Sequence, residues 1–348
     1  MDMVTPLAPP GTLPATEPPS SAPDEPVLEV RDLHVHLVTR RATIRAVNGV
    51  SFAVRAGETL GLVGESGSGK SMTCLGLMRL TPRHAAVGGQ VLLAGDDLMT
   101  KSEAEMAQVR GRRIAMILQD PMSSLNPVFS IGMQLREAVN LASGLRGPGL
   151  RQRAVDLLKA VGITAPAARL RAFPHQLSGG MRQRVVGAMA IAGEPRVLIA
   201  DEPTTSLDVT IQAQYLRLLR QLRAAHNLAI VFVTHDLGIV ARMCDRVAVM
   251  YAGQIVEIAA THDLWTAPAH PYTRALLDSM PKLHGGRQRL TPIDGQPPDV
   301  AAMPKGCPFH PRCPEALPRC SREAPPQVTI APGHAVRCWL STPHVTAV

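Results

Sequence analysis

Eight residues at positions 64–71, GESGSGKS, have the types and spacing of a phosphate cradle. Glycines at the first, fourth and sixth positions let the backbone approach phosphate oxygens, and a helix that begins there adds a favourable dipole. We expect Lys70 to reach the β and γ phosphates of a nucleotide and the Ser71 hydroxyl to bind Mg²⁺. A plain glycine-rich turn is the alternative. The apolar run TLGLV before the loop and the helical pattern MTCLGLMRL after it disfavour that alternative.

A carboxylate pair, Asp201 and Glu202, follows the apolar run RVLIA. Asp201, at the end of a buried strand, can hold Mg²⁺, and Glu202 can act as a general base toward an attacking water. His235 ends the next strand-like segment and is expected at the same sheet edge, where ligands bind in open α/β sheets. Acids after a strand also cap helices, and a lone histidine is often structural. Beside a phosphate cradle, the catalytic interpretation is favoured for all three residues.

The segments that position these residues alternate between strand and helix patterns. Strand signals before residue 64, at 196–201 and at 229–236 predict a mainly parallel, doubly wound α/β sheet. Helical patterns predict an inserted helical subdomain over about 103–184. The Pro-rich residues 1–26 read as a disordered arm, residues 27–262 as the main domain, and residues 263–348, where Pro and Gly become frequent, as a C-terminal module.

Bulk composition excludes some classes of protein. Hydrophobic residues make up 45% of the 348 positions but aromatic residues only 3%, so the core is expected to be aliphatic. The net charge of +8 is spread over scattered arginines, which is weak evidence for nucleic acid binding. Neither a secretory signal nor an apolar run of membrane-spanning length occurs, so we do not expect the chain itself to cross a membrane.

The order of the motifs resembles the ATP-binding cassette (ABC) ATPases over residues 27–262. LSGGMRQR at 177–184 is similar to the signature of that family, and Gln119 in ILQDP is similar to its Q-loop glutamine. The resemblance implies a P-loop nucleotide-binding domain with a RecA-like core, an antiparallel β subdomain and the helical insertion. It implies that Lys70, Glu202 and His235 are catalytic and that Ser71, Gln119 and Asp201 bind Mg²⁺. The implied ATP contacts are Gly64, Glu65, Ser66, Gly67, Ser68, Gly69, Lys70, Ser71, Met72, Gln119 and Asp201.

The same resemblance implies a second ATP-binding subunit. In that family two domains face head to tail, so Ser178, Gly179 and Gly180 would contact the ATP of the partner. The chain has one P-loop and one signature. A heterodimer with a sister subunit is therefore expected, with a homodimer as the less favoured alternative.

Three local features indicate a branch of the family. QDPMSSLNPVFSIGMQL at 119–135, HPYTRALLDSMP at 270–281 and the cysteine-bearing tail look like the ATP-binding subunits of dipeptide and oligopeptide importers, the peptide/nickel group. The resemblance implies an ATPase coupled to peptide import, peripheral to the cytoplasmic face of the inner membrane. Its implied partners are two permease subunits and an external substrate-binding protein, with no nucleic acid. The alternatives are an importer of nickel or another small solute, and a soluble ABC ATPase acting on nucleic acid or ribosomes.

Four of the six cysteines lie in the tail, with the spacing C-x5-C-x6-C-x17-C. Four thiolates suit either Zn²⁺ or an iron–sulfur cluster, although the C-x2-C pairs typical of structural zinc are absent. The importer resemblance implies a [4Fe-4S] cluster in some members. We therefore predict Cys307, Cys313, Cys320 and Cys338 as cluster ligands, with zinc as the alternative and disulfides third. Cys74 and Cys244 are predicted to be buried small apolar residues.

Overall fold

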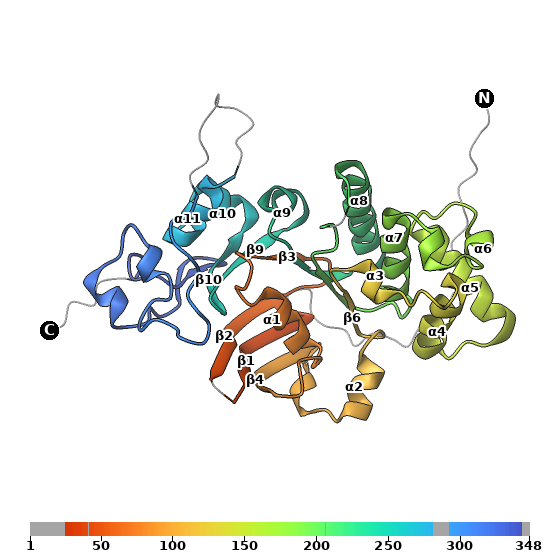
Figure 1. The fold of residues 1–348 in the computed structure, drawn as a ribbon, viewed down its shortest axis with the longest axis horizontal. Coiled ribbons are helices and arrows are strands. Elements are labelled where there is room, and N and C mark those ends of the chain that lie inside the picture. Colours follow the sequence, from red (N-terminus) through yellow and green to blue (C-terminus); the bar gives the residue numbers. More distant parts are fainter. Residues whose placement is uncertain (1–24, 41, 206, 281–291, 343–348) are drawn as a thin grey trace.

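The computed structural model describes residues 25–40, 42–205, 207–280 and 292–342. The predicted disordered arm at 1–26 lies almost wholly outside the described residues. Within them the chain forms a four-stranded and an eight-stranded sheet, with helices on both faces of the larger sheet (Figure 1). This arrangement is a mixed α/β fold, as the alternating sequence patterns predict.

The smaller sheet is antiparallel, with strand order β2-β1-β4-β5. Its strands are β1 Leu28–Val38, β2 Thr43–Val54, β4 Ala85–Leu93 and β5 Asp96–Asp97. Alternating burial along β1 places one face of this sheet against α1, Lys70–Leu77. The packing is close, because a Cβ added to Gly76 of α1 would lie 3.0 Å from a methyl carbon of Val35.

The larger sheet has the order β11-β12-β10-β9-β3-β8-β7-β6. The five strands from β9 to β6 are parallel, and the three strands at the opposite edge are antiparallel. Parallel order puts the carboxyl ends of β3, β6, β7, β8 and β9 at one edge of the sheet. The strands are β3 Thr59–Val63, β6 Ile114–Ile117, β7 Val197–Asp201, β8 Ala229–Val233, β9 Arg246–Tyr251, β10 Gln254–Ala260, β11 Val328–Ala331 and β12 His334–Val336.

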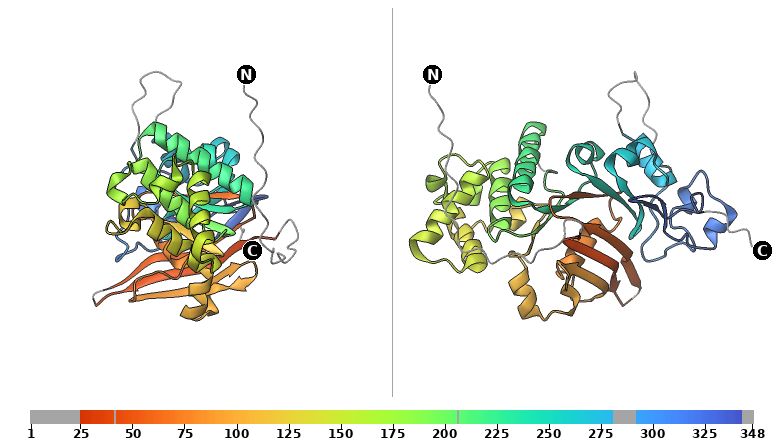
Figure 2. Two further views of the ribbon diagram at one scale, coloured as in Figure 1. Left: turned by 90° about the vertical axis from the view of Figure 1, so that its right-hand side faces the viewer. Right: turned by 180° about the vertical axis from the view of Figure 1, so that it is seen from behind.

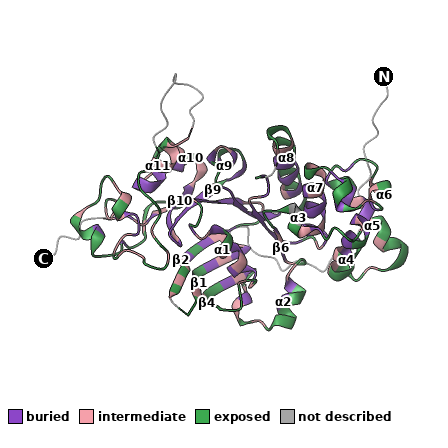
Figure 3. Cartoon of the chain, viewed as in Figure 1, coloured by how far each residue is buried: buried purple, intermediate pink, exposed green. Residues whose placement is uncertain are grey.

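The parallel strands are buried on both faces, and this explains their continuous apolar sequences (Figure 3). Along β8, Ile230 and Phe232 face one apolar cluster with the helices, while Val231 and Val233 face a second cluster shared with α1 and the smaller sheet. Cys74 and Cys244 are buried in these clusters, as predicted. The two apolar clusters therefore hold the parallel strands, and so fix the positions from which their loops start.

Most helices lie in a group at one end of the molecule or on the outer face of the larger sheet (Figure 2). The span 103–184, predicted as a helical insertion, also contains β6, which pairs with β7 in the core sheet. Among the described residues, none of the helices combines the length and apolar composition that crossing a bilayer requires. The remaining helices are α2 Glu103–Val109, α3 Pro121–Ser124, α4 Ile131–Ser143, α5 Gly147–Ala160, α6 Pro166–Arg169, α7 Gly179–Ala190, α8 Val209–His226, α9 Leu237–Met243, α10 Thr261–Thr266 and α11 Pro271–Asp278.

The segment after residue 262 returns to the core sheet. β12 pairs with β10 through Glu257 and Val336, and β11 pairs with β12. Two short 3-10 helices follow, η3 at His310–Arg312 and η4 at Pro318–Ser321. Cys313 comes directly after η3, and Cys320 lies within η4. This segment lies at the end of the molecule opposite α4 and α5 (Figures 1 and 2).

Candidate functional site

The residues predicted to bind or hydrolyse a nucleotide lie at or just after the carboxyl ends of four neighbouring parallel strands. The loop 64–69 follows β3, Gln119 follows β6, Asp201 ends β7, and His235 comes two residues after β8. Because the strands are adjacent and parallel, their ends meet at one edge of the sheet. The structure therefore brings together the cradle, the carboxylate pair, the glutamine and the histidine.

Two glycines of the cradle have backbone conformations that other residues cannot easily adopt. Gly64 has φ of 152°, and an added Cβ would lie 2.2 Å from the carbonyl oxygen of Met250. Gly69 has φ of 103°, and its Cβ would lie 2.4 Å from the carbonyl oxygen of Ala46. The loop thus packs directly against β9 and β2, which fixes its curvature.

Lys70 lies inside the loop. Its Nζ donates to the carbonyl oxygens of Gly64 and Glu65 at 2.8 and 2.9 Å, and to Ser68 Oγ at 3.4 Å. Burial lowers the pKa of this ammonium, although the nearby carboxylates of Glu202 and Asp201 oppose the effect. Ser66 and Gly67 at the tip of the loop are exposed, and Met72 in α1 is half-buried. A phosphate entering the loop would meet a positive charge held by neutral oxygens that it can replace.

Asp201 is joined to the cradle by Ser71. The Ser71 hydroxyl donates to Asp201 Oδ1 at 3.1 Å, and burial raises the pKa of the Asp201 carboxyl. Adjacent ligands of an octahedral Mg²⁺ lie about 3 Å apart. This pair of oxygens therefore fits two neighbouring positions around such an ion.

Glu202 is held in a left-handed backbone conformation, with φ of 45°. Its N–H donates to the carbonyl oxygen of Val233, and its carboxylate accepts from Gln119 Nε2 at 3.1 Å and Thr205 Oγ1 at 2.9 Å. The second carboxylate oxygen lies 3.4 Å from His235 Nδ1. Such strain at a polar residue is typical of functional sites, and here it aims the carboxylate across the strand ends.

The signature residues begin a different helix. Ser178 caps α7, with its Oγ accepting from the N–H of Met181, and both Ser178 and Gly179 are exposed. Gly180 packs on α8, because an added Cβ would lie 2.5 Å from a methyl carbon of Ile211. α7 belongs to the group of helices α3 to α7 at one end of the molecule, here called the helical group, whereas α1 lies between the two sheets (Figure 1).

Sequence reasoning missed three side chains that hold the site. Thr205 donates to the Glu202 carboxylate. The Tyr272 hydroxyl accepts from the N–H of Glu65 at 3.0 Å, and Arg312 forms two hydrogen bonds with the Glu65 carboxylate. The motifs HPYTRALL and HPRC, which contain Tyr272 and Arg312, were the available signal, but sequence alone gave no partner for either residue.

The four tail cysteines are unpaired thiols. Burial raises the pKa of Cys307 to about 11 and also raises the pKa of Cys313 and Cys338, and at least one other tail thiol adds to each shift. Over the described ranges, no three His, Cys, Asp or Glu side chains converge as a group that could hold a metal ion. The structure therefore does not support the expectation of zinc or an iron–sulfur cluster at these thiols.

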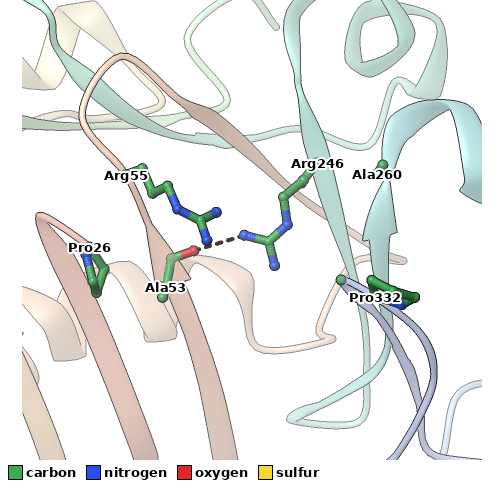
Figure 4. Close-up of a pocket in the computed structure, with 7 residues that line it drawn as sticks. Pro26, Ala53, Arg55, Arg246, Ala260 and Pro332 are labelled. Carbon is green, nitrogen blue, oxygen red and sulfur yellow. Dashed lines mark hydrogen bonds between the residues drawn. The ribbon is translucent and has the colours of Figure 1, made fainter. Parts of the chain in front are cut away.

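One pocket lies away from the strand ends. It has a volume of about 370 Å³ and is lined by residues that include Arg55, Arg246 and Pro332 (Figure 4). Arg246 donates to the carbonyl oxygen of Ala53 and to the Glu58 carboxylate, both at 3.1 Å. Its charge is thus balanced within the chain. The pocket contains none of the residues singled out by sequence.

Comparison with known proteins identifies two regions of the chain. Residues 47–205 match the family model described as ABC transporter, and residues 256–320 match the model described as oligopeptide/dipeptide transporter, C-terminal region. A solved dimeric ATP-binding cassette in a post-hydrolysis state, bound to ADP and Pi, covers 67% of this chain and 98% of its own. Its TM-score is 0.60 at 24% identity, so this likeness concerns the fold alone.

Curated relatives match almost the whole chain. A probable peptide ABC transporter ATP-binding protein of Sinorhizobium fredii is 50% identical over 90% of this chain and 95% of the relative. A dipeptide transport ATP-binding protein of Bacillus subtilis is 48% identical over 91% and 95%, and an oligopeptide transport ATP-binding protein of Salmonella typhimurium is 45% identical over 91% and 94%. This chain belongs to the family of ATP-binding subunits of dipeptide and oligopeptide ABC transporters.

Proposed function

We propose that this chain binds and hydrolyses ATP at the strand-end site and so powers peptide import through a membrane ABC transporter. The observation that carries the proposal is the meeting of Lys70 and Ser71 with Asp201 and Glu202, in a chain of this family. The peptide itself is handled elsewhere in the complex. The chain supplies the energy-converting step.

Backbone N–H groups of the cradle and the start of α1 are proposed to hold the phosphates of ATP, with the Lys70 ammonium between the β and γ groups. Ser71, Asp201 and Gln119 are the proposed ligands of Mg²⁺. The 3.1 Å separation of the Ser71 and Asp201 oxygens supports the first two. When bound, the ion offsets negative charge that develops on the phosphate oxygens.

Glu202 is the proposed general base. Its carboxylate is positioned by Gln119 and Thr205 and can accept a proton from a water directed at the γ-phosphate. His235, 3.4 Å from the same carboxylate, is proposed to contact the γ-phosphate. Gln119 donates a hydrogen bond to the base, and the helical group begins two residues after Gln119 in the chain. Movement of that group would therefore change the position of the base.

A second ATP-binding subunit is proposed to complete the site. The exposed start of α7 presents Ser178, Gly179 and backbone N–H groups to solvent, as an anion-binding helix terminus would. These residues would close over the ATP held by the other subunit. We propose a sister chain as this partner, in a heterodimer.

The permease subunits have a suitable surface on the helical group. A groove of about 550 Å³ is lined by Phe129, Met133, Leu141 and Leu150 together with Arg136. Leu141 is 66% exposed, and neighbouring Val128 is 74% exposed. The residues that line the groove, from Phe129 to Leu150, belong to the helices that come after Gln119 in the chain. We propose that a permease helix with an apolar face binds there, which would place the chain on the cytoplasmic face of the inner membrane, with the external binding protein across it.

The tail thiols are proposed to bind a [4Fe-4S] cluster rather than a single ion. Each thiolate of such a cluster binds a different iron, so the four sulfurs need not converge on one point. The support is the resemblance together with the mutual electrostatic influence of four unpaired thiols, of which two are half-buried and two are buried. Anaerobic purification with iron, sulfide and zinc analysis tests this proposal. Colourless protein with one zinc per chain would refute it.

Co-purification with the permeases tests the main proposal. ATP hydrolysis by the complex should rise when the binding protein presents a peptide, and Lys70→Ala should abolish that hydrolysis because the phosphates lose their cation. Arg322→Ala removes an exposed positive charge and serves as the control. Wild-type hydrolysis in Lys70→Ala would refute the site, and stimulation by a non-peptide solute alone would refute the cargo.

A further inference from the structure

We propose that Arg312 is a positioning residue for the P-loop, through which the C-terminal segment sets the affinity of the chain for ATP. The inference rests on the proposed ATP site and adds a residue outside the cassette motifs. Arg312 lies 247 positions from its partner, Glu65, which is the second residue of the loop. The proposal is carried by three sets of contacts.

The first set is a bidentate ion pair. Arg312 Nη1 and Nη2 donate to the two Glu65 carboxylate oxygens at 2.7 and 3.0 Å. The Arg312 side chain is only 4% exposed and the Glu65 side chain 26% exposed. Hydrogen bonding to Glu65 raises the pKa of Arg312, so the arginine stays charged. Two parallel bonds fix both the charge and the direction of the carboxylate, which a single point charge would not do.

The second set anchors the guanidinium on its other side. Arg312 Nε donates to the carbonyl oxygen of Asp294 at 2.9 Å, and Nη1 also reaches the Tyr251 hydroxyl at 3.3 Å. Tyr251 ends β9, the strand next to β3. The arginine is therefore held by the tail and by the core sheet as well as by Glu65.

The third set holds the backbone of Glu65. Its N–H donates to the Tyr272 hydroxyl at 3.0 Å. The Tyr272 ring is buried and packs on Tyr251 and Phe309, with ring centroids 4.6 and 5.3 Å away. Phe309 and Arg312 belong to the same short stretch of the tail. The C-terminal segment thus grips one loop residue by its backbone and its side chain together.

This grip matters because Glu65 is an anion in a loop proposed to bind anions. Paired with Arg312, its charge is neutralised. Without the arginine, a partly buried carboxylate would lie unpaired beside the phosphates and repel them. The effect acts on binding, since neither residue touches Glu202 or the water it would activate. We therefore expect a higher KM for ATP with kcat largely retained.

Arg312→Ala tests the proposal. We expect ATP affinity, measured by titration with a fluorescent ATP analogue, to fall about tenfold, and KM to rise in step. The ATP affinity of Arg312→Lys should be intermediate between those of Arg312→Ala and the wild type, because lysine keeps the charge but not the bidentate geometry. Arg322→Ala, which removes an exposed arginine from the same segment, is the matched control and should bind ATP as the wild type does.

A double variant separates positioning from loss of structure. Adding Glu65→Gln to Arg312→Ala removes the unpaired anion, so ATP affinity should recover by several-fold over the single variant. A purely structural role predicts a further loss or no recovery. Arg312→Ala with wild-type affinity, or a double variant no better than the single one, would overturn the inference. If the wild-type chain fails to bind ATP at all, the proposed function fails instead.

Discussion

The start of α1 contains Lys70 and Ser71 and lies beside Asp201 and Glu202 of its own chain, whereas the start of α7 presents Ser178 and Gly179 to solvent. α1 has no side-chain cap, and Lys70 is held by carbonyl oxygens of the preceding loop. α7 is capped by the Ser178 side chain and has no acidic residue in its own first turn. The difference teaches that one helix start is held by contacts within its own chain, while the other is open to solvent and free for the second subunit that we propose.

Glu202→Gln tests the α1 side of the comparison most severely. The amide keeps the size of the carboxylate and can still accept from Gln119, so ATP binding should be retained. Loss of the base should lower kcat about 10²- to 10⁴-fold. Steady-state hydrolysis and ATP titration measure the two effects separately. Glu194→Gln, which alters an exposed carboxylate paired with Arg153, should leave both unchanged. Unaltered turnover in Glu202→Gln would remove the general-base role.

Gly179→Asp tests the open side. An added Cβ at Gly179 has no neighbouring atom within 4 Å, so the fold should accept the substitution. The new carboxylate would face the γ-phosphate of the partner subunit, and like charges at close range should lower turnover of the dimer about 10²-fold. ATP binding by the isolated chain should be unchanged, because its own cradle is not involved.

The matched control for this variant is Gly149→Asp, at the first turn of α5, where an added Cβ also meets no atom within 4 Å. Mixed dimers carrying Gly179→Asp in one subunit give the sharper result. Hydrolysis should be lost at the site of the other subunit and kept at the site of the variant. Loss at the variant's own cradle would end the distinction between the two helix starts.

Sequence indicates the α1 side well because its signals are local. Gly64 and Gly69 lie where only glycine fits, and the continuous apolar runs before the loop and before Asp201 are fully buried parallel strands. Adjacent parallel strands then bring Gln119, Glu202 and His235 to one edge, which the strand-end rule anticipates. The fold class and the clustering of these side chains follow from such patterns.

The contacts of Arg312 and Tyr272 with Glu65, here called the brace, have no local sequence signal. β11 and β12 are four and three residues long, and the exposed pattern of β11 gives no alternation that would predict a place in the core sheet. Arg312 and Tyr272 lie 247 and 207 positions from Glu65, and each is an ordinary member of its own turn or helix. Their contacts depend on the return of the C-terminal segment to β10, which residue types alone do not specify.

Acid should weaken the Tyr272 part of the brace, with a smaller effect than those of the Glu202→Gln and Gly179→Asp variants. His270 caps the start of α11, and its Nδ1 accepts from the N–H of Tyr272 at 3.0 Å, so the ring must be neutral there. Burial, with a smaller contribution from Arg274, lowers the pKa of His270 to about 3. The unfolded chain has the ordinary value near 6.5, so it binds more protons than the folded chain between these values. Stability is thus intact above about pH 6.5 and is lost as the pH falls toward 3, by about 2 kcal/mol at pH 5.

His270→Asn tests this pH dependence, because the asparagine keeps a capping oxygen but cannot take up a proton. Urea unfolding at pH 7.5 should show the variant less stable than the wild type, and at pH 5 the difference should shrink by about 2 kcal/mol. His226→Asn, at an exposed position at the end of α8, should follow the wild type at both values. Parallel profiles for His270→Asn and the wild type would mean that the start of α11 is not the acid-sensitive point.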